Sequence, residues 1–350
     1  MIRLAYVINS VEGGGAALPA PRVIEFLQRH GFAVTVLALT RRDGRALAAF
    51  AAAGIEVRVR DGGERDHLAA LGWLRRLLHE LKPDLIWSSL SRATILCQIA
   101  KGRTPHVSWQ HAAYLRTGNR LVMRALARRT ALWVADSDQV AALTRQRMGA
   151  AHHSVLVWPL FAADPDARQA APWRAGEPVR IGSLGRLHPV KGHDVLVDAL
   201  GQLDGRYQAS IAGEGAERGA LAGQAAAVGV TLALPGFVEA AAYLAGLHLY
   251  VQPSRSEGLC VAAHEAMAAG LPVIASAVGE LPNTIMAGTG IVVPPGDAKA
   301  LAAAIETMVS EPESLAGIGA AARMRVLDRF GPERYEAAGL AVVARLKALL

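Results

Sequence analysis

The chain has 350 residues, of which 52% are hydrophobic and 19% are charged. It is too long for one ordinary hydrophobic core, so two domains are expected. No stretch approaches the roughly 18 consecutive apolar residues of a membrane-spanning helix, and the first residues lack the basic start and the cleavage site of a signal peptide. The two cysteines, Cys97 and Cys260, lie far apart without metal-ligand spacing, which indicates a reducing cytosol and no disulfide framework.

The net charge of +7 is unevenly distributed along the chain. Residues 1–160 contain 22 Lys and Arg against 11 Asp and Glu, a net charge of +11, whereas residues 161–350 contain 15 against 19, a net charge of −4. A basic half suits nucleic acid, an anionic membrane or a phosphorylated substrate. A general preference for Arg over Lys along the whole chain is the alternative explanation.

Short apolar runs alternate with helical patterns along the first half of the chain. This alternation is typical of a parallel sheet that is covered by helices on both faces. The predicted strands are Leu4–Asn9, Ala33–Leu39, Glu56–Val59, Leu85–Ser88, His106–Trp109 and Leu132–Ala135. The predicted helices are Pro21–His30, Arg45–Ala53, His67–Leu81 and Arg120–Arg129. Residues 1–160 are therefore assigned to an N-terminal α/β domain.

The pattern breaks at residues 155–176, a proline-containing, Ala-rich stretch of which 161–176 is assigned to the interdomain linker. A second α/β domain is predicted at 177–331. Its strands are predicted at Val179–Leu184, Tyr207–Ala212, Thr231–Leu234, Leu249–Gln252, Val273–Ser276 and Gly290–Val293. Helices are predicted at Ala298–Val309 and Glu311–Phe330, and an amphipathic helix at 332–350 is expected to pack back on the N-terminal domain.

Two glutamates, Glu257 and Glu265, stand on the two sides of a predicted helix start. Gly258 allows a sharp turn, and good helix formers fill residues 259–269. Glu257 therefore lies in the loop and Glu265 on the second turn of the helix. The free N–H groups of the helix start and its positive dipole end make an anion site between the two glutamates. This layout suits a diphosphate that carries a hydroxyl-bearing ring at each end, as a nucleotide sugar does.

Glycine-containing loops follow the first strand of each predicted domain. In the first domain, Gly14 and Gly15 belong to a Gly-Gly-Gly turn where backbone could approach a phosphate or sugar, although a flexible turn without a ligand is the alternative. In the second, Arg186 and Lys191 bracket the loop 185–192. Two fixed cations at the carboxyl end of a strand suit a diphosphate, while two solvated surface charges are the alternative.

Five motifs in the second half occur in a characteristic order: Gly-Arg-Leu-x3-Lys-Gly at 185–192, Gly-Glu-Gly at 213–215, Leu-Pro-Gly-Phe-Val at 234–238, the Glu257/Glu265 pair, and Val-Pro-Pro-Gly-Asp at 293–297. Together they resemble the donor-binding domain of the family-4 retaining glycosyltransferases. The resemblance implies the GT-B fold, an α/β architecture of two Rossmann-like, doubly wound domains that face a central cleft. It covers nearly the whole chain and is most specific in the second domain.

The resemblance also implies roles for individual residues. Arg186 and Lys191 would bind the donor diphosphate, and amides near 259–261 would complete that cradle. Glu265 would bond the ribose and Glu257 the transferred sugar. Backbone near Phe237 and Val238 would hold the nucleobase. The remaining implied donor contacts are glycines, namely Gly14, Gly15, Gly185, Gly213 and Gly258.

His111 follows a predicted strand and resembles the family's N-domain histidine beside the reacting sugar. A histidine at a strand end is also often a hydrogen-bonded structural group, and the residues alone leave this alternative open.

A separate pattern in the same domain is independent of the resemblance. Arg residues recur every four positions and would form one cationic stripe on a helix, and both this stripe and the apolar-basic helix around Trp73–Leu78 suit anionic lipid headgroups, with solvated faces as the alternative. The stripe comprises Arg116, Arg120, Arg124 and Arg128, with Arg129 adjacent.

The expected function is a retaining transfer of a hexose-type sugar from a UDP- or GDP-linked donor to a hydroxyl of a glycan or lipid-linked acceptor, in bacterial polysaccharide or lipopolysaccharide synthesis. No acidic pair at a strand end suggests a metal, and no cofactor is expected. The protein is expected in the cytoplasm, with peripheral contact to the inner face of the membrane. Alternatives are a GT-B-like nucleotide-sugar epimerase or phosphorylase and a non-catalytic sugar-binding homologue. Nucleic acid is not an expected partner, because no nucleic-acid motif is present.

Overall fold

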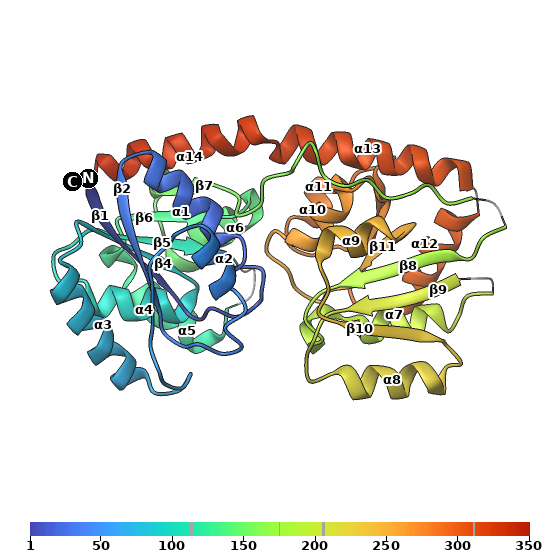
Figure 1. Ribbon diagram of the computed structural model, residues 1–350, viewed down its shortest axis with the longest axis horizontal. Coiled ribbons are helices and arrows are strands. Elements are labelled where there is room, and N and C mark those ends of the chain that lie inside the picture. Colours follow the sequence, from blue (N-terminus) through green and yellow to red (C-terminus); the bar gives the residue numbers. More distant parts are fainter. Residues whose placement is uncertain (112–114, 175, 205–206, 311) are drawn as a thin grey trace. The chain divides into compact units, whose positions relative to one another are not determined.

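The structure is a computed structural model that describes residues 1–350 except 112–114, 175, 205–206 and 311, and the side chains of 312 and 313 are likewise not described. The chain divides into two compact units (Figure 1). Unit 1 comprises Met1–Phe161 and Tyr335–Leu350, and unit 2 comprises Ala162–Arg334. Each unit contains one parallel β-sheet with helices packed against it.

The sheet of unit 1 has seven parallel strands in the order β3-β2-β1-β4-β5-β6-β7. The first six begin and end within two residues of their predicted bounds. The prediction of a pattern break from residue 155 is wrong at its first residues, because three apolar residues there form β7. The bounds are β1 Ile2–Ile8, β2 Phe32–Ala38, β3 Val57–Val59, β4 Leu85–Ser89, β5 His106–Gln110, β6 Leu132–Ala135 and β7 Val155–Val157.

Helices connect these strands. The sequence analysis did not single out α4 or α6, although α6 carries ordinary signals: Ser137 accepts a hydrogen bond from Val140 N–H at its start, and Gly149 ends it in the left-handed conformation. The α-helices are α1 Ala20–Arg29, α2 Leu47–Ala52, α3 His67–Leu81, α4 Ser91–Ala100, α5 Thr117–Ala125 and α6 Asp138–Met148, and short 3-10 turns are η1 Ala127–Arg129 and η2 His152–Ser154.

The C-terminal helix α14, Pro332–Lys347, contributes to the core of unit 1 from Tyr335 onward. The Tyr335 ring lies 5.5 Å from that of Trp158 and 6.1 Å from that of Phe26, measured between centroids. Gly339 faces the same aromatic residues, and a Cβ there would lie 2.6 Å from Phe26 Cζ. A glycine therefore lets this helix approach the aromatic core closely.

The sheet of unit 2 has six parallel strands in the order β10-β9-β8-β11-β12-β13. Five of them have the predicted bounds, and the sixth, β10, is displaced by one or two residues. The bounds are β8 Val179–Leu184, β9 Tyr207–Ala212, β10 Leu232–Gly236, β11 Leu249–Gln252, β12 Val273–Ser276 and β13 Gly290–Val293. The remaining elements are η3 Pro189–Lys191, α7 His193–Leu200, α8 Arg218–Ala227, α9 Ala240–Ala245, α10 Val261–Ala268, α11 Leu281–Thr284, α12 Ala298–Val309 and α13 Pro312–Phe330.

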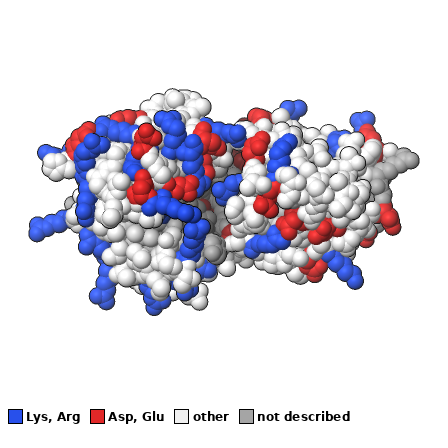
Figure 2. Space-filling model, turned by 90° about the horizontal axis from the view of Figure 1, so that it is seen from below, with Lys and Arg blue, Asp and Glu red and all other residues white. Residues whose placement is uncertain are grey.

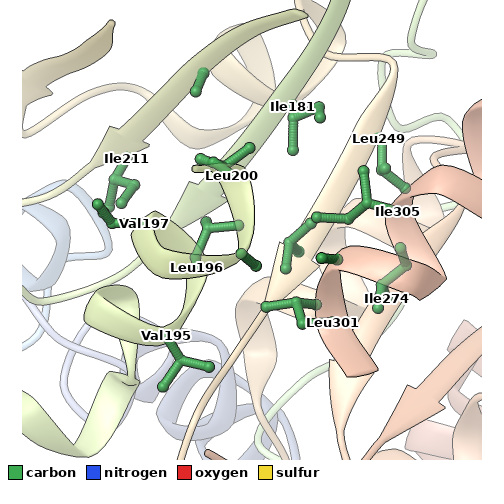
Figure 3. Packing of buried hydrophobic residues seen from close by; sticks show 14 of the residues in the cluster. Ile181, Val195, Leu196, Val197, Leu200, Ile211, Leu249, Ile274, Leu301 and Ile305 are labelled. Atoms are coloured by element: carbon green, nitrogen blue, oxygen red, sulfur yellow. The ribbon is translucent and has the colours of Figure 1, made fainter. Parts of the chain in front are cut away.

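Figure 3 shows how helices and strands close the core of unit 2. Leu196 and Leu200 of α7 and Leu301 and Ile305 of α12 pack against apolar side chains of the sheet. The strand residues labelled there are Ile181, Ile211, Leu249 and Ile274. In both sheets the strand order reverses beside the first strand, at β1/β4 and at β8/β11. Ligands of such sheets bind beyond the carboxyl ends of the strands at this reversal.

Candidate functional site

The loops that follow β8 and β11 meet at the reversal point of the unit 2 sheet. Lys191, in the first loop, donates from Nζ to Glu257 Oε1 in the second at 2.7 Å. The side chains are 23% and 9% exposed. Burial lowers the pKa of Lys191, but the Glu257 carboxylate outweighs this effect, so the pKa lies above its usual value and the ammonium is retained. The structure thus brings together two of the predicted site residues.

Glu257 is held by a chain of polar side chains that rises from β11. Ser254 Oγ donates to Glu257 Oε1 at 2.6 Å, and Gln252 Nε2 donates to Ser254 Oγ at 2.8 Å. Tyr250 Oη in turn donates to Gln252 Oε1 at 2.7 Å. Sequence reasoning missed these three residues, although their alternation in an otherwise apolar strand marks polar groups on one buried face. The chain fixes the carboxylate beside Lys191.

The glycine motifs of unit 2 pack loop against loop. A Cβ on Gly213, whose φ is +136°, would lie 2.0 Å from the carbonyl oxygen of Gly185. A Cβ on Gly192 would lie 2.1 Å from the carbonyl oxygen of Pro253. Gly185 itself faces the methylenes of Lys191, with 3.7 Å between its ideal Cβ position and Lys191 Cε. These glycines therefore permit the backbone contacts that place Lys191.

The turn before α10 differs from the prediction. The left-handed residue is Cys260, with a φ of 66°, and not Gly258, and α10 begins at Val261 rather than near Leu259. The backbone of Gly258 packs closely against Gly279, since a Cβ on Gly279 would lie 2.3 Å from the carbonyl oxygen of Gly258. Leu259 and Cys260 are buried, and burial raises the pKa of the Cys260 thiol, which stays protonated.

Glu265 lies on the second turn of α10, close to Glu239. Glu239 caps α9 by accepting hydrogen bonds from the N–H groups of Ala241 and Ala242 at 2.9 and 2.7 Å. Burial and the negative charge of Glu239 raise the pKa of Glu265 to about 7. Phe237, 53% exposed, and the half-buried Val238 precede Glu239 directly. The predicted ribose and nucleobase residues are thus neighbours.

In unit 1, His111 follows β5 and is hydrogen-bonded through both ring nitrogens. Ser89 Oγ, at the end of β4, lies 2.6 Å from Nε2, and Asp136 Oδ2, after β6, lies 2.8 Å from Nδ1. Burial raises the pKa of the Asp136 carboxyl, while His111 opposes that shift by favouring its charged form. Sequence reasoning identified His111 but neither of its partners.

The glycine turn after β1 keeps space open. A Cβ on Gly15 would meet nothing within 4 Å, and one on Gly14 would meet only Glu12 Cγ at 3.8 Å. Neither glycine has a positive φ. Protein packing therefore does not require glycine at these positions, in contrast to Gly192 and Gly213.

The predicted arginine stripe does not lie on one helix. Arg120 and Arg124 are exposed on α5, whereas Arg116 precedes that helix and Arg128 and Arg129 belong to η1. The apolar residues of the Trp73–Leu78 segment are also not available to lipid, since Leu74, Leu77 and Leu78 belong to the core. The structure reveals a different apolar feature: Leu121 and Val122 on α5 are 57% and 42% exposed between the arginines.

The described residues contain neither a membrane-spanning helix nor a cluster of metal-binding side chains. No helix among them is both long and apolar enough to cross a membrane. No group of three or more His, Cys, Asp or Glu side chains that could hold a metal ion gathers within the part of the chain that the structure describes.

Comparison with known proteins identifies the family. A family model described as glycosyl transferases group 1 matches residues 178–311, and one described as glycosyltransferase family 4 matches residues 13–162. The chain belongs to the family-4 glycosyltransferases. This family-4 glycosyltransferase has the GT-B fold, and Anabaena HepE in complex with UDP-glucose superposes with a TM-score of 0.86 over 100% of both chains at 22% identity.

Curated relatives match over part of their length. The chain is 34% identical to a GDP-mannose-dependent phosphatidylinositol monomannoside mannosyltransferase of Mycolicibacterium smegmatis, over 49% of each chain. It is 31% identical to the 2-deoxystreptamine glucosyltransferase of Streptomyces kanamyceticus, over 63% of this chain and 62% of the relative. The chain therefore spans about half to three fifths of the length of these relatives.

Proposed function

We propose that the protein is a retaining hexosyltransferase that moves a sugar from a UDP- or GDP-linked donor to a hydroxyl group of a glycan or lipid-linked acceptor. The observation that carries the proposal is the Lys191–Glu257 pair, held at the reversal point of the unit 2 sheet beside the start of α10. It supplies a fixed cation for a diphosphate and a fixed carboxylate for sugar hydroxyls within one hydrogen bond of each other.

The donor would bind unit 2 as follows. Lys191, Arg186 and the N–H groups at the start of α10 would hold the diphosphate, with Leu259, Cys260 and Val261 as the backbone of that start. Glu257 would accept hydrogen bonds from the transferred sugar and Glu265 from the ribose. The nucleobase would lie along Val238. Gly185, Gly213 and Gly258 would shape this cradle by letting its loops touch, and in unit 1 the open turn at Gly14 and Gly15 leaves room for a phosphate or sugar.

Catalysis would follow from the charge that appears as the sugar–phosphate bond breaks. Negative charge would then grow on the diphosphate, and Lys191 and Arg186 would stabilise this charge more in the transition state than in the bound donor. The acceptor hydroxyl attacks on the face that the diphosphate leaves, which retains the anomeric configuration, and the departing phosphate takes its proton. Loss of one such cationic contact costs on the order of 100-fold in rate.

The relatives support the class of reaction. They include a GDP-mannose-dependent mannosyltransferase, a glucosyltransferase, and a lipopolysaccharide core mannosyltransferase of Rhizobium meliloti that is 29% identical over 47% of this chain. From these we infer a surface glycan or glycolipid acceptor in a bacterium.

The test begins with thermal shift measurements against UDP-, GDP- and ADP-sugars, since a bound ligand raises stability by mass action. The donor so identified is then incubated with lipid-linked and free glycan acceptors. Transfer with retained anomeric configuration supports the proposal. An isomerised donor without any acceptor would instead establish an epimerase, and donor binding without turnover would establish a sugar-binding homologue.

We also propose that unit 1 contacts the inner face of the cytoplasmic membrane through α5. Exposed Leu121 and Val122 lie among the exposed Arg116, Arg120 and Arg124, an apolar–cationic combination that suits the interface of anionic lipids. On the left of Figure 2, Lys and Arg side chains border a broad area of uncharged surface, with Asp and Glu side chains among them at its upper edge.

Vesicle sedimentation tests the membrane proposal. Leu121→Asp and Arg120→Glu should each weaken sedimentation with vesicles that contain phosphatidylglycerol, and high salt should weaken it further. Arg75→Glu, an exposed arginine on α3, serves as the matched charge control. Equal sedimentation of the two α5 variants and the wild type would contradict contact through α5.

A further inference from the structure

The carboxyl ends of three adjacent strands in unit 1 carry one continuous hydrogen-bond chain. Ser89 ends β4, His111 follows β5 and Asp136 follows β6, and these strands are neighbours in the sheet. The Nε2 atom of His111 lies 2.6 Å from Ser89 Oγ, and its Nδ1 atom lies 2.9 and 2.8 Å from the two oxygens of Asp136. The Trp109 ring packs 5.1 Å from the histidine ring, measured between centroids, which further restricts it.

All three side chains are largely withdrawn from solvent. Ser89 is fully buried, Asp136 is 3% exposed, and the side chain of His111 is 7% exposed. A carboxylate at this depth is costly unless a partner donates to it. His111 is one such partner, so the position of the ring and the charge of Asp136 depend on each other.

The order Ser–His–Asp is that of a hydrolase triad, but the burial of the serine disfavours nucleophilic attack. A nucleophile must meet the carbonyl carbon of its substrate, and Ser89 Oγ is enclosed by protein. The hydrogen bonds from Ser89 and to Asp136 therefore serve to orient the ring of His111. An ionised carboxylate only accepts hydrogen bonds, so Nδ1 of His111 carries a hydrogen and donates it to Asp136. In the neutral ring, Nε2 then offers a lone pair, which accepts the hydroxyl hydrogen of Ser89.

We propose that Asp136 is a positioning residue that fixes the ring of His111, with Nδ1–H donating to Asp136 and Nε2 accepting from the buried hydroxyl of Ser89. This inference rests on the proposed function, because it concerns the histidine that the family resemblance places beside the reacting sugar.

The neighbouring side-chain network provides a matched control. Ser88 Oγ lies 2.8 Å from His106 Nε2, and Thr130 Oγ1 lies 3.0 Å from His106 Nδ1, so a second Ser–His network has a hydroxyl at Nδ1 in place of a carboxylate. All of its members are buried, and none has been placed in the binding site. Thr130→Val should therefore lower stability without changing the kcat of the folded enzyme.

The decisive measurement is the two-bond 1H–15N spectrum of the histidine side chains in the full-length protein at neutral pH, with His111→Gln used to assign the signals. We expect Nδ1 of wild-type His111 to be protonated and Nε2 to be bare. In Asp136→Asn this preference should be lost, while His106 keeps its signals. A bare Nδ1 with a protonated Nε2 in the wild type overturns the proposal.

Kinetics with the donor and acceptor found for the proposed function supply a second, independent readout. Asp136→Asn should lower kcat/KM about 10- to 100-fold, the usual cost of removing the group that orients a histidine, and Asp136→Glu should restore part of it.

The two proposals fail in different ways. If the tautomer result holds but no sugar donor binds or reacts, the proposed function fails and the role of Asp136 stands. If the wild type transfers sugar and Asp136→Asn transfers it at the same rate, the role of Asp136 fails and the proposed function stands.

Discussion

At the scale of single residues, the Lys191–Glu257 pair determines whether the donor cradle is charged and ordered. Glu257 accepts hydrogen bonds from Lys191 and Ser254 on the same oxygen, with distances of 2.7 and 2.6 Å. Removal of the lysine leaves a 9% exposed carboxylate whose remaining side-chain donors are neutral, Ser254 Oγ at 2.6 Å and Gln252 Nε2 at 3.4 Å. A buried charge that loses its partner is strongly destabilising, whereas removal of both charges is much less so.

We therefore predict that Lys191→Met lowers the free energy of unfolding by about 2–3 kcal/mol, and that Lys191→Met/Glu257→Gln regains most of it. Neither variant should transfer sugar. Urea titration measures the first effect and donor turnover the second. Arg58→Met is the control, because Arg58 pairs with the exposed Glu56 and Glu80 and should cost less than about 1 kcal/mol. Equal losses in Lys191→Met and Arg58→Met would contradict a buried pair.

Glu265 gives a pH-dependent prediction at the same scale. Its folded-state pKa is about 7, raised by burial and by Glu239, whereas the unfolded value is near 4.5. Between these pH values the folded state binds more protons than the unfolded state, so the contribution of Glu265 to stability falls as pH rises from 4.5 through 7. Glu265→Gln should therefore raise stability by on the order of 2 kcal/mol at pH 8 and change little at pH 4.5.

Thermal unfolding of wild type and Glu265→Gln across this range measures the effect. Asp297→Asn is a suitable control, since Asp297 caps α12 by accepting from Ala300 N–H and lies on a different helix. A stability gain of Glu265→Gln that is the same at both pH values would show that charge is not its cause. The same variant should bind the nucleoside diphosphate more weakly at pH 8, because the carboxylate proposed to bind ribose is gone.

At the scale of elements, the loops of unit 2 hold the site through backbone contact. Gly192 has a φ of +64°, and a Cβ there would lie 2.1 Å from the carbonyl oxygen of Pro253. Gly223, exposed on α8, has open space at its Cβ position. The two glycines thus offer opposite environments for the same substitution.

We predict that Gly192→Ala lowers the free energy of unfolding by more than about 2 kcal/mol and weakens donor binding, since the loop that carries Lys191 must move. Gly223→Ala should raise it by about 0.5–1 kcal/mol, because alanine is the better helix former. Denaturant titration and nucleotide binding measure both. A neutral Gly192→Ala would show that the loops are not packed as described.

The elements also show what a local pattern predicts and what it does not. Strand bounds in unit 2 follow from short apolar runs between turns, and five of six have the predicted residues. Lys191 and Glu257 were found because each lies in a motif. Ser89 and Asp136 were not, because each is ordinary in its own segment and only the order of strands brings them to His111 over separations of 22 and 25 residues. The left-handed conformation of Cys260 was not predicted, because the same turn contains Gly258, and glycine adopts this conformation more readily than cysteine.

At the scale of the whole molecule, each unit has its own core and should unfold in its own transition. Five of the six tryptophans belong to unit 1, and only Trp173 belongs to unit 2. Tryptophan fluorescence therefore mainly follows unit 1, whereas calorimetry follows both units. Helix α14 links the C-terminus to the first unit, since Gly339 lies against Phe26 and Trp158.

This division allows one experiment to assign stability and donor binding to separate units. Gly339→Ala places a Cβ 2.6 Å from Phe26 Cζ, and this overpacking should lower the melting temperature measured by fluorescence by about 5 °C. Gly317→Ala, which has open space at its Cβ position on α13, should leave that melting temperature unchanged. A nucleoside diphosphate should raise the melting temperature of the unit 2 transition, which calorimetry detects, because the proposed cradle lies in unit 2. The melting temperature measured by tryptophan fluorescence should stay nearly unchanged. If the nucleotide instead raises the fluorescence transition alone, the donor is bound by unit 1, and the roles of Lys191 and Glu257 must be reassigned.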